Sequence, residues 1–244
     1  MADCLDLDRV APTVRPAGPP AGYQRWRELL FVHWSYDAAQ VRALVPRSLE
    51  LDLWGGRAWV GLVPFRMQAT RPRWMPRPLG LDFLETNLRT YVHQGGKPGV
   101  YFFSLEASSW LAVKAARVTW GLPYFHAAMT ARREGERITY RSQRKGDRAA
   151  HLDVTYDVRD DLDPSAPGTF QHFLLERYHL FAEKAGQLRR GQVHHRPYPV
   201  RAAAIASLDD GLVAATGLPA GGTPEAVHYS DGVDVEVFGP YHDV

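Results

Sequence analysis

The chain has 244 residues, 45% of them hydrophobic, and its 29 lysines and arginines nearly balance its 27 acidic residues. The basic residues are spread along the chain instead of forming a stripe, which argues against nucleic acid as a partner. No apolar run approaches the roughly 20 residues that cross a bilayer, and the N-terminus lacks a secretion signal. A single cysteine, Cys4, permits no internal disulfide and no thiolate zinc site. These features predict a soluble cytoplasmic protein that binds neither nucleic acid nor membrane.

The first part of the chain predicts an irregular arm followed by strands and one short helix. Residues 1–22 include a stretch rich in Pro, Ala and Gly, which is typical of irregular structure. An apolar strand follows, and Asp37 then offers an N-cap for a short helix. Two strands are expected on either side of a turn at Gly55–Gly56. Residues 71–80 form a proline-rich loop.

Hairpins and two further helices are predicted along the rest of the chain. Residues 83–106 are expected to form a hairpin around a QGGKPG turn, and a second hairpin turns at Glu134–Gly135. Between them, Ser108 or Ser109 can cap a helix. The clearest helix covers residues 170–184, FQHFLLERYHLFAEK, because its large apolar residues recur at helical spacing. Further strands complete the C-terminal part.

Strands outnumber helices in this prediction, most neighbouring strands are linked by hairpins, and no βαβ alternation or internal repeat is evident. The pattern predicts a single α+β domain over residues 23–240. Its sheet is mostly antiparallel and closed into a cone- or barrel-like shape, with a few helices outside.

The segment FLETNLRTYV, residues 83–92, has two very different faces. Side chains of a strand point to opposite faces with period two. One face is aliphatic apart from two threonines, and the other carries Phe83, Glu85, Asn87, Arg89 and Tyr91. In an open antiparallel sheet this second face could be turned to water. In a closed sheet it would line the interior, where an acid must be paired or have its pKa raised.

Other polar residues have both a structural and a functional interpretation. Arg177 lies on the apolar stripe of its predicted helix, where it could extend to water or bind a buried carboxylate such as Glu85 or Glu106. His228 lies in a strand-like segment and could be a hydrogen-bonded structural group or face a ligand. His194–His195 has no partners at a metal-binding spacing, so we expect a loop role.

Known cofactor and metal motifs are absent from the sequence. It contains no glycine-rich dinucleotide loop, no Walker loop, no HExxH and no GxSxG elbow. We therefore predict neither a cofactor nor a metal. Lys114 falls in the middle of a predicted helix, where exposure to solvent is the expected environment.

Eight runs occur in the order in which one known family carries them: LLFVHW, LVPRSLELD, AWVGLVPFRM, FLETNLRTYV, GVYFFSLEA, GLPYF, LLERYHLF and HYSDGVDVEVFGP. On these runs the chain resembles the YqjF-like family, an uncharacterised bacterial group of the acetoacetate decarboxylase-like superfamily. The resemblance covers residues 23–240. It implies a cone-shaped closed β-structure with helices packed outside and a pocket within.

The resemblance also implies roles for individual residues. Arg27 is similar to the arginine with which the decarboxylases hold the anionic end of their substrate, and Glu85 stands in the place of their pocket glutamate. Their Schiff-base lysine follows a proline, and here Tyr124 follows Pro123. A phenol cannot form an imine with a ketone, so imine-based decarboxylation is not expected. A second acidic position of the decarboxylases, near Val60, is also missing.

Two functions fit these residues. In the first, an enzyme of lyase, hydratase or isomerase type acts on a small keto acid or related carbonyl compound without an imine. Glu85 is its general acid/base, and Tyr124 donates a hydrogen bond to developing oxyanion charge. The remaining expected pocket residues bind the substrate: Arg27, Asn87, Arg89, Phe83, Tyr91, Phe103 and His228. In the second, the same pocket binds or senses a small ligand without chemistry.

The 71–80 loop is open to two interpretations. Trp74 and Met75 among arginines could dock on an acidic partner or a membrane surface, or the loop could be a lid over the pocket. A small organic ligand, anionic at one end, is the expected partner, and the oligomeric state is left open.

Overall fold

The computed structural model describes residues 7–184 and 186–241, and these residues form a single twelve-stranded sheet with few helices. Cys4 lies outside the described residues. The strands are β1 (Gly22–Tyr36), β2 (Glu50–Leu51), β3 (Ala58–Pro72), β4 (Leu81–Gln94), β5 (Lys97–Ala107), β6 (Tyr124–Glu134), β7 (Arg137–Arg144), β8 (His151–Asp161), β9 (His179–Lys184), β10 (Gln187–His194), β11 (Val200–Asp210) and β12 (Ala226–Tyr241).

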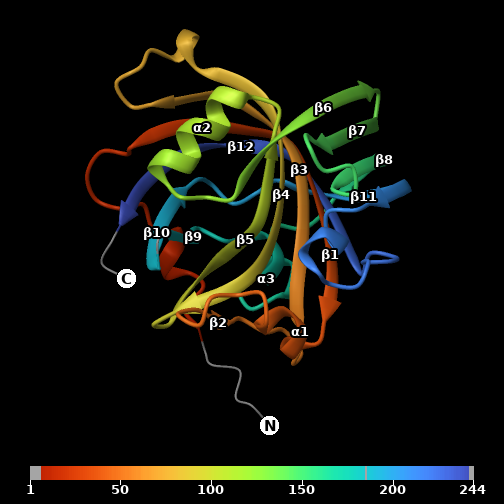
Figure 1. Ribbon diagram of the computed structural model, residues 1–244, viewed down its shortest axis with the longest axis horizontal. Helices are drawn as coiled ribbons and strands as arrows, with labels where there is room; N and C mark the ends of the chain where they lie inside the picture. The colour runs from red at the N-terminus through yellow and green to blue at the C-terminus, as the bar shows by residue number, and fades with distance from the viewer. Residues whose placement is uncertain (1–6, 185, 242–244) are drawn as a thin grey trace.

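The sheet closes on itself twice. A first ring runs β4-β5-β9-β10-β12-β1-β3 and back to β4, because β10 pairs with β12 and β4 pairs with β5. A second ring leaves β5 through β6, β7, β8 and β11 and returns to β12. Figure 1 shows β6, β7, β8 and β11 on one side of β1, β3 and β4, with β9 and β10 on the other. The predicted closed α+β fold is confirmed.

Most strand pairs are antiparallel, and two pairs that involve β5 are exceptions. β5 runs parallel to both β6 and β9. The connection from β5 to β6 is a helix, α2 (Trp110–Thr119), as a parallel neighbour requires. The sequence pattern does not indicate this strand–helix–strand unit, because α2 lies between two hairpins that are individually antiparallel.

The central residues of the strands shared by the two rings are buried on both faces, so these strands separate two cores. On β4, Leu88 and Val92 belong to one core, whereas Tyr91 belongs to the other. We call the core that contains Tyr91, Phe31 and Phe173 the first core; it lies within the first ring. The core that contains Leu88, Val92 and the apolar residues of β7 and β8 is the second core.

The helices are short and close the ends of the rings. α1 (Ala38–Arg42) begins after Asp37, as predicted, although the Asp37 side chain forms no cap hydrogen bond. α2 is capped by the side chain of Ser109, which accepts from the Ala112 N–H, and it packs Val113 on the first core. In α3 (Phe170–Leu175), Thr169 accepts from the His172 N–H in the same way. Single turns of 3-10 helix complete the set at Ala11–Thr13, Arg77–Leu79 and Ala214–Thr216.

The prediction of one helix over residues 170–184 is wrong. The helix ends at Leu175, and residues from His179 onward form β9. Residues 172–179 are all buried, so this segment has no solvent-facing side of the kind a surface helix needs. Glu176 leaves the helical conformation, and its buried carboxylate accepts hydrogen bonds from the Tyr178 hydroxyl at 2.6 Å and from the Tyr198 N–H at 3.0 Å.

The part of the N-terminal arm that the structure describes, residues 7–21, is irregular and lies against the rings. Gln192 donates to the carbonyl of Pro12 at 3.0 Å, and Arg15 pairs with Glu236 at 2.5 Å. Arg9 forms an ion pair with Asp52. The arm therefore packs on both the β10–β12 edge and the turn before β3.

Candidate functional site

The polar face of β4 points into the first core. Glu85 is directly opposite Phe65 on β3 and Ala107 on β5, and both of these residues belong to the first core. The carboxyl group of Glu85 is 3% exposed and accepts a hydrogen bond of 2.9 Å from the hydroxyl of Tyr124 at the start of β6. β4 and β6 thus bring together the two residues for which the sequence predicted catalytic roles.

Glu85 is a neutral acid at pH 7. Burial raises the pKa of its carboxyl from 4.5 to about 8; the Tyr124 hydrogen bond opposes this shift, and the charge of Glu106 adds to it. Glu106 lies on the other face of the sheet, where it pairs with Arg144. Among the described residues, no cation forms an ion pair that would keep Glu85 ionised. A protonated carboxyl with a pKa this close to neutrality can both give and take a proton.

Two further residues of this face, Asn87 and Arg89, are buried without full hydrogen bonding. Each is 7% exposed. Arg89 donates to the carbonyl of Leu174 at 3.3 Å, and its guanidinium lies 5.7 Å from the ring centre of Phe31. Arg89 Nε and Asn87 Oδ1 have no hydrogen-bond partner within the described part of the chain. Buried polar atoms are seldom unpaired in native proteins, so both atoms are candidates to bind a ligand.

Tyr91, the last residue of the row, holds α3 in place. Its hydroxyl donates to the carbonyl of Leu174 at 2.8 Å and lies 2.8 Å from Nε2 of His33. Its ring is 5.0 Å from that of Phe173. Both hydrogen-bonding roles of the hydroxyl are therefore used within the protein.

His195 faces the same interior from the opposite wall, and the sequence analysis assigned it only a loop role. It follows β10, is 3% exposed, and stacks on Tyr178 with ring centres 4.6 Å apart. Tyr198 and Trp26 complete its surroundings at 4.7 Å and 5.7 Å. The signal available in the sequence was an aromatic residue three positions later, Tyr198 in HHRPYP.

Arg27 is not brought to Glu85. Its guanidinium donates to the carbonyls of Trp26 and Val233 at 2.8 Å and 2.7 Å and pairs with Asp234. The cause is a bulge: β1 has one more residue than β3 between Arg27 and Val32, and Glu28 has a φ of 52°. Without this extra residue Arg27 would share the face of Phe31; with it, Arg27 is turned to the opposite face.

The other three predicted pocket residues are divided between the two cores. Phe83 is partly buried against the first core. His228 is opposite Phe31, and burial lowers its pKa. Phe103 packs against the second core, 6.0 Å from the ring of Tyr101. It is the extra residue of a register shift on β5, where Leu88 is opposite Ser104 and Arg89 is opposite Phe102, so alternation fails there. Its predicted place in the pocket is therefore wrong.

Arg177 binds a buried carboxylate, but not either of the two that the sequence analysis considered. Its guanidinium lies 2.6 Å from Asp52, and both side chains are almost fully buried. Arg177 also donates to the carbonyl of Phe173 at 2.7 Å. This pair joins the end of α3 to the turn before β3. It therefore stabilises the position of α3 and does not contact Glu85.

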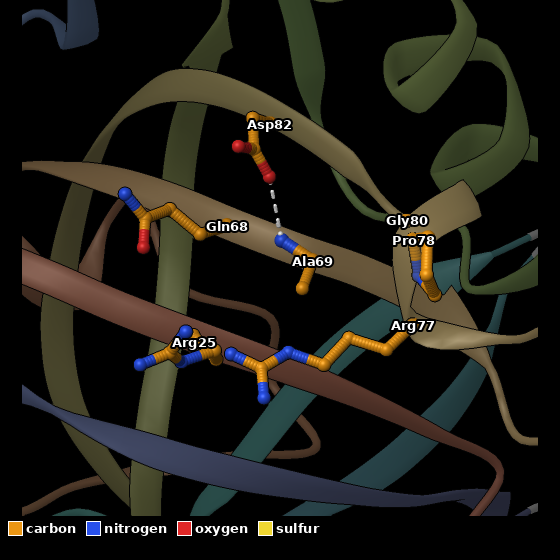
Figure 2. Close-up of a pocket in the computed structure, with 7 residues that line it drawn as sticks. All are labelled: Arg25, Gln68, Ala69, Arg77, Pro78, Gly80 and Asp82. Carbon is orange, nitrogen blue, oxygen red and sulfur yellow. Dashed lines mark hydrogen bonds between the residues drawn. The ribbon is translucent and has the colours of Figure 1, made fainter.

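The 71–80 loop borders a cleft of about 360 Å³ on the outer face of the sheet. Figure 2 shows Arg25 and Arg77 pointing toward one another across this cleft and Asp82 bound to the main chain of Ala69. Arg25 is opposite Gln68, and this row lies on the face that Arg27 occupies, not the face of Glu85. Trp74 on the loop is 76% exposed.

No lysine lies in the first core. All four lysines of the chain are described, and none is buried. Lys114 projects from α2 with its ammonium 4.1 Å from the ring centre of Trp110. Within residues 7–184 and 186–241, no three His, Cys, Asp or Glu side chains gather as a metal site would require. In the same ranges, each helix is too short or too polar to cross a lipid bilayer.

Comparison with known proteins places the chain in a family. Residues 23–234 match the DUF2071 family, described as an uncharacterized conserved protein. The chain is 37% identical over 213 residues to the uncharacterized protein YqjF of Bacillus subtilis (strain 168), covering 87% of this chain and 88% of that protein.

Two solved structures share the fold at low sequence identity. The enduracididine biosynthesis enzyme MppR, complexed with pyruvate, aligns with a TM-score of 0.61 at 15% identity over 91% of this chain and 90% of that one. Acetoacetate decarboxylase from Legionella pneumophila aligns with a TM-score of 0.60 at 15% identity over 99% of both chains. The chain therefore has the acetoacetate decarboxylase-like fold and belongs to the DUF2071 family, which includes YqjF.

Proposed function

We propose that the interior of the first ring binds a small carbonyl compound with an anionic end, such as a keto acid, and that Glu85 exchanges a proton with it. The observation that carries this proposal is the buried carboxyl group of Glu85, which accepts a hydrogen bond from Tyr124 and forms no ion pair with a cation among the described residues. Burying such a group is costly, and strongly perturbed ionisable groups are concentrated at functional sites.

Arg89 is the residue that we propose for the anionic end of the ligand, in place of Arg27. Its guanidinium lies on the same face as Glu85 and keeps Nε without a partner. Four residues of strand separate the two main-chain positions by about 13 Å. A ligand of a few carbon atoms bound between the two polar ends would contact both. Asn87 lies between them; its side-chain N–H can donate to the carbonyl oxygen of the ligand, whereas its unpaired Oδ1 can only accept.

The proposed reaction moves one proton and needs no imine. The ionised form of Glu85 takes a proton from the carbon beside the carbonyl group, which leaves an enolate, and the carboxylic acid so formed gives the proton back to the carbon or the oxygen of that enolate. Tyr124 donates to the same carboxyl group, so it stabilises the ionised form. Proton exchange of this kind is the common step of lyase, hydratase and isomerase reactions beside a carbonyl group.

The neighbours in structure support the ligand class. MppR has been solved with pyruvate and with the condensation product of pyruvate and imidazole 4-carboxaldehyde. The first ligand is a small keto acid, and the second is a condensation product of that acid. In the present chain Tyr124 stands where the resemblance places the Schiff-base lysine, so a keto acid would be held by hydrogen bonds and charge alone.

The test is proton exchange into a keto acid. The full chain is incubated with pyruvate or 2-oxobutyrate in D2O, and loss of the C3 proton signals is followed by NMR. We expect exchange in the wild type and a loss of about 100- to 10,000-fold in Glu85→Gln, because the amide cannot transfer a proton. Glu134→Gln, at the exposed turn between β6 and β7, is the matched control and should exchange at the wild-type rate.

Two further measurements separate this proposal from its alternatives. Borohydride added during incubation with pyruvate should leave the mass of the protein unchanged; an adduct on a lysine would mean an imine mechanism. Exchange that is equal in wild type and Glu85→Gln would remove Glu85 from the reaction. A keto acid that binds with one-to-one stoichiometry but exchanges no proton would favour ligand binding without chemistry.

A further inference from the structure

His195 has one ring nitrogen that is fixed by the main chain and one that is free. Its Nδ1 lies 2.7 Å from the carbonyl oxygen of Arg196, so Nδ1 carries the proton and donates it. In the neutral ring Nε2 then has a lone pair and can only accept. Nε2 is buried and has no hydrogen-bond partner among the described residues. Burial lowers the pKa of His195 to about 4, so the ring is neutral at pH 7 and keeps this acceptor.

Glu176 holds the aromatic walls around His195. Its carboxylate accepts from the hydroxyl of Tyr178 and from the main-chain N–H of Tyr198, and Ser165 donates to it at 3.0 Å. Tyr178 stacks on the His195 ring at 23° between planes, and the ring of Tyr198 lies 4.7 Å from it at 50°. These contacts and the hydrogen bond at Nδ1 fix the orientation of the His195 ring, so Nε2 stays an unpaired acceptor.

The same aromatic residues join His195 to the polar row of β4. Tyr198 lies 5.3 Å from Phe31, the ring over which the Arg89 guanidinium is placed. Trp26 lies 6.0 Å from Phe65, the residue directly opposite Glu85. His195, in the connection between β10 and β11, therefore faces the interior of the first ring. It lies across from the part of β4 between Glu85 and Arg89.

We infer that His195 Nε2 is a ligand-binding group that accepts a hydrogen bond from a hydroxyl or N–H of the ligand. The inference rests on the proposed function and narrows its substrate class. Arg89 Nε needs an acceptor and His195 Nε2 needs a donor. A simple keto acid such as pyruvate supplies only acceptors. The ligand of this site is instead a carbonyl acid that also carries a hydroxyl or amino group.

The experiment compares two probes that differ by one hydroxyl group. Binding of pyruvate and of 3-hydroxypyruvate to the full chain is measured by calorimetry at neutral pH. We expect 3-hydroxypyruvate to bind about tenfold more tightly, as one hydrogen bond to an otherwise unpaired buried acceptor provides. His195→Phe keeps the aromatic packing and removes the acceptor. It should therefore bind both probes with the affinity that the wild type has for pyruvate. His195→Gln, which retains an acceptor, should recover part of the difference.

A spectroscopic measurement on the same protein tests the contact directly. With histidine labelled by 15N, the Nε2 signal missing from His195→Phe identifies His195 in the wild type. That signal should move on addition of 3-hydroxypyruvate and stay in place with pyruvate. A variant that loses both affinities equally, or a signal that neither bound probe moves, would assign His195 a packing role and overturn the inference.

The inference and the proposed function fail in different ways. Exchange that depends on Glu85, together with equal affinities for the two probes, overturns the inference and leaves the proposed function in place. A His195-dependent preference for 3-hydroxypyruvate without any proton exchange supports the inference and removes the proposed reaction. If neither probe binds, both are overturned.

Discussion

Arg27 and Arg89 show how local backbone geometry determines which residues form the site. Both are arginines on apolar strands, and family resemblance favours Arg27. The alternation of β4 correctly indicates which residues share a face with Glu85 because the pairing of β4 with β3 is regular from Phe83 to Thr90. The register shift between Leu88 and Arg89 in the pair with β5 adds its extra residue to β5. β1 has a bulge at Glu28, which nothing in the sequence RWRELLF marks, since a glycine would be expected at a φ of 52°. The placement of Arg27 therefore could not be predicted from the sequence.

The pKa of Glu85 makes the stability of the fold depend on pH. Its pKa is 4.5 when exposed and about 8 in the folded protein, because of burial. Between these values the folded state holds a proton that the unfolded state has released, so stability falls as pH rises. At about 1.4 kcal/mol per pKa unit, the whole shift corresponds to at most about 5 kcal/mol.

Glu85→Gln isolates this effect because the amide does not titrate. We expect the unfolding free energy of the wild type, relative to Glu85→Gln, to be highest at about pH 4 and to decrease steadily up to about pH 9. Urea unfolding at several pH values measures it. A difference that stays constant across this range would show that Glu85 titrates in the folded protein as it does in water.

At the scale of elements, α3 and β9 show the limit of periodicity. The apolar residues of 170–184 do recur at helical spacing, but residues 172–179 are all buried, so the pattern there carries no information about a solvent face. Glu176, whose carboxylate is occupied by Tyr178 and the main chain of Tyr198, ends the helix through contacts distant in sequence. Local sequence could predict that α3 exists, but not where it ends.

The position of α3 depends on the buried ion pair of Arg177 with Asp52. We expect Arg177→Met to lower the unfolding free energy by about 3–5 kcal/mol, since it leaves the Asp52 carboxylate buried with less compensation. Arg141→Met is the matched control: its pair with Asp153 is largely exposed and should matter by less than about 1 kcal/mol. Urea unfolding of both variants gives the comparison. Equal effects would mean that Arg9 alone is sufficient to compensate Asp52.

At the scale of the whole molecule, the sequence predicted a closed sheet but not its division into two rings. Hairpin connections and alternation give antiparallel neighbours, and they account for pairs such as β4–β5 and β6–β7. The closures β10–β12 and β5–β9 join segments far apart in sequence, and no local pattern indicates them. The parallel β5–β9 pair also depends on the end of α3 at Leu175, whereas helical periodicity predicts one helix over residues 170–184.

The two rings predict an uneven pattern of amide hydrogen exchange. β1, β3 and β4 are paired on both sides and buried on both faces, so their central amides should exchange only on global unfolding. The exposed tip between β6 and β7, residues 132–137, should exchange at least about a thousandfold faster. Peptide-resolved mass spectrometry provides the measurement. Equal protection of the tip and of β4 would contradict this order.

Because β4 has no solvent side, its length cannot change. Adding or removing one residue near Asn87 would turn the residues on one side of the change to the opposite face of the sheet. Either Leu88 would face the first core, or Glu85 would face the apolar residues of the second core. Tolerated insertions in this protein should therefore occur at its turns, such as Gly95–Gly96 and Gly135, where an added side chain would meet open space.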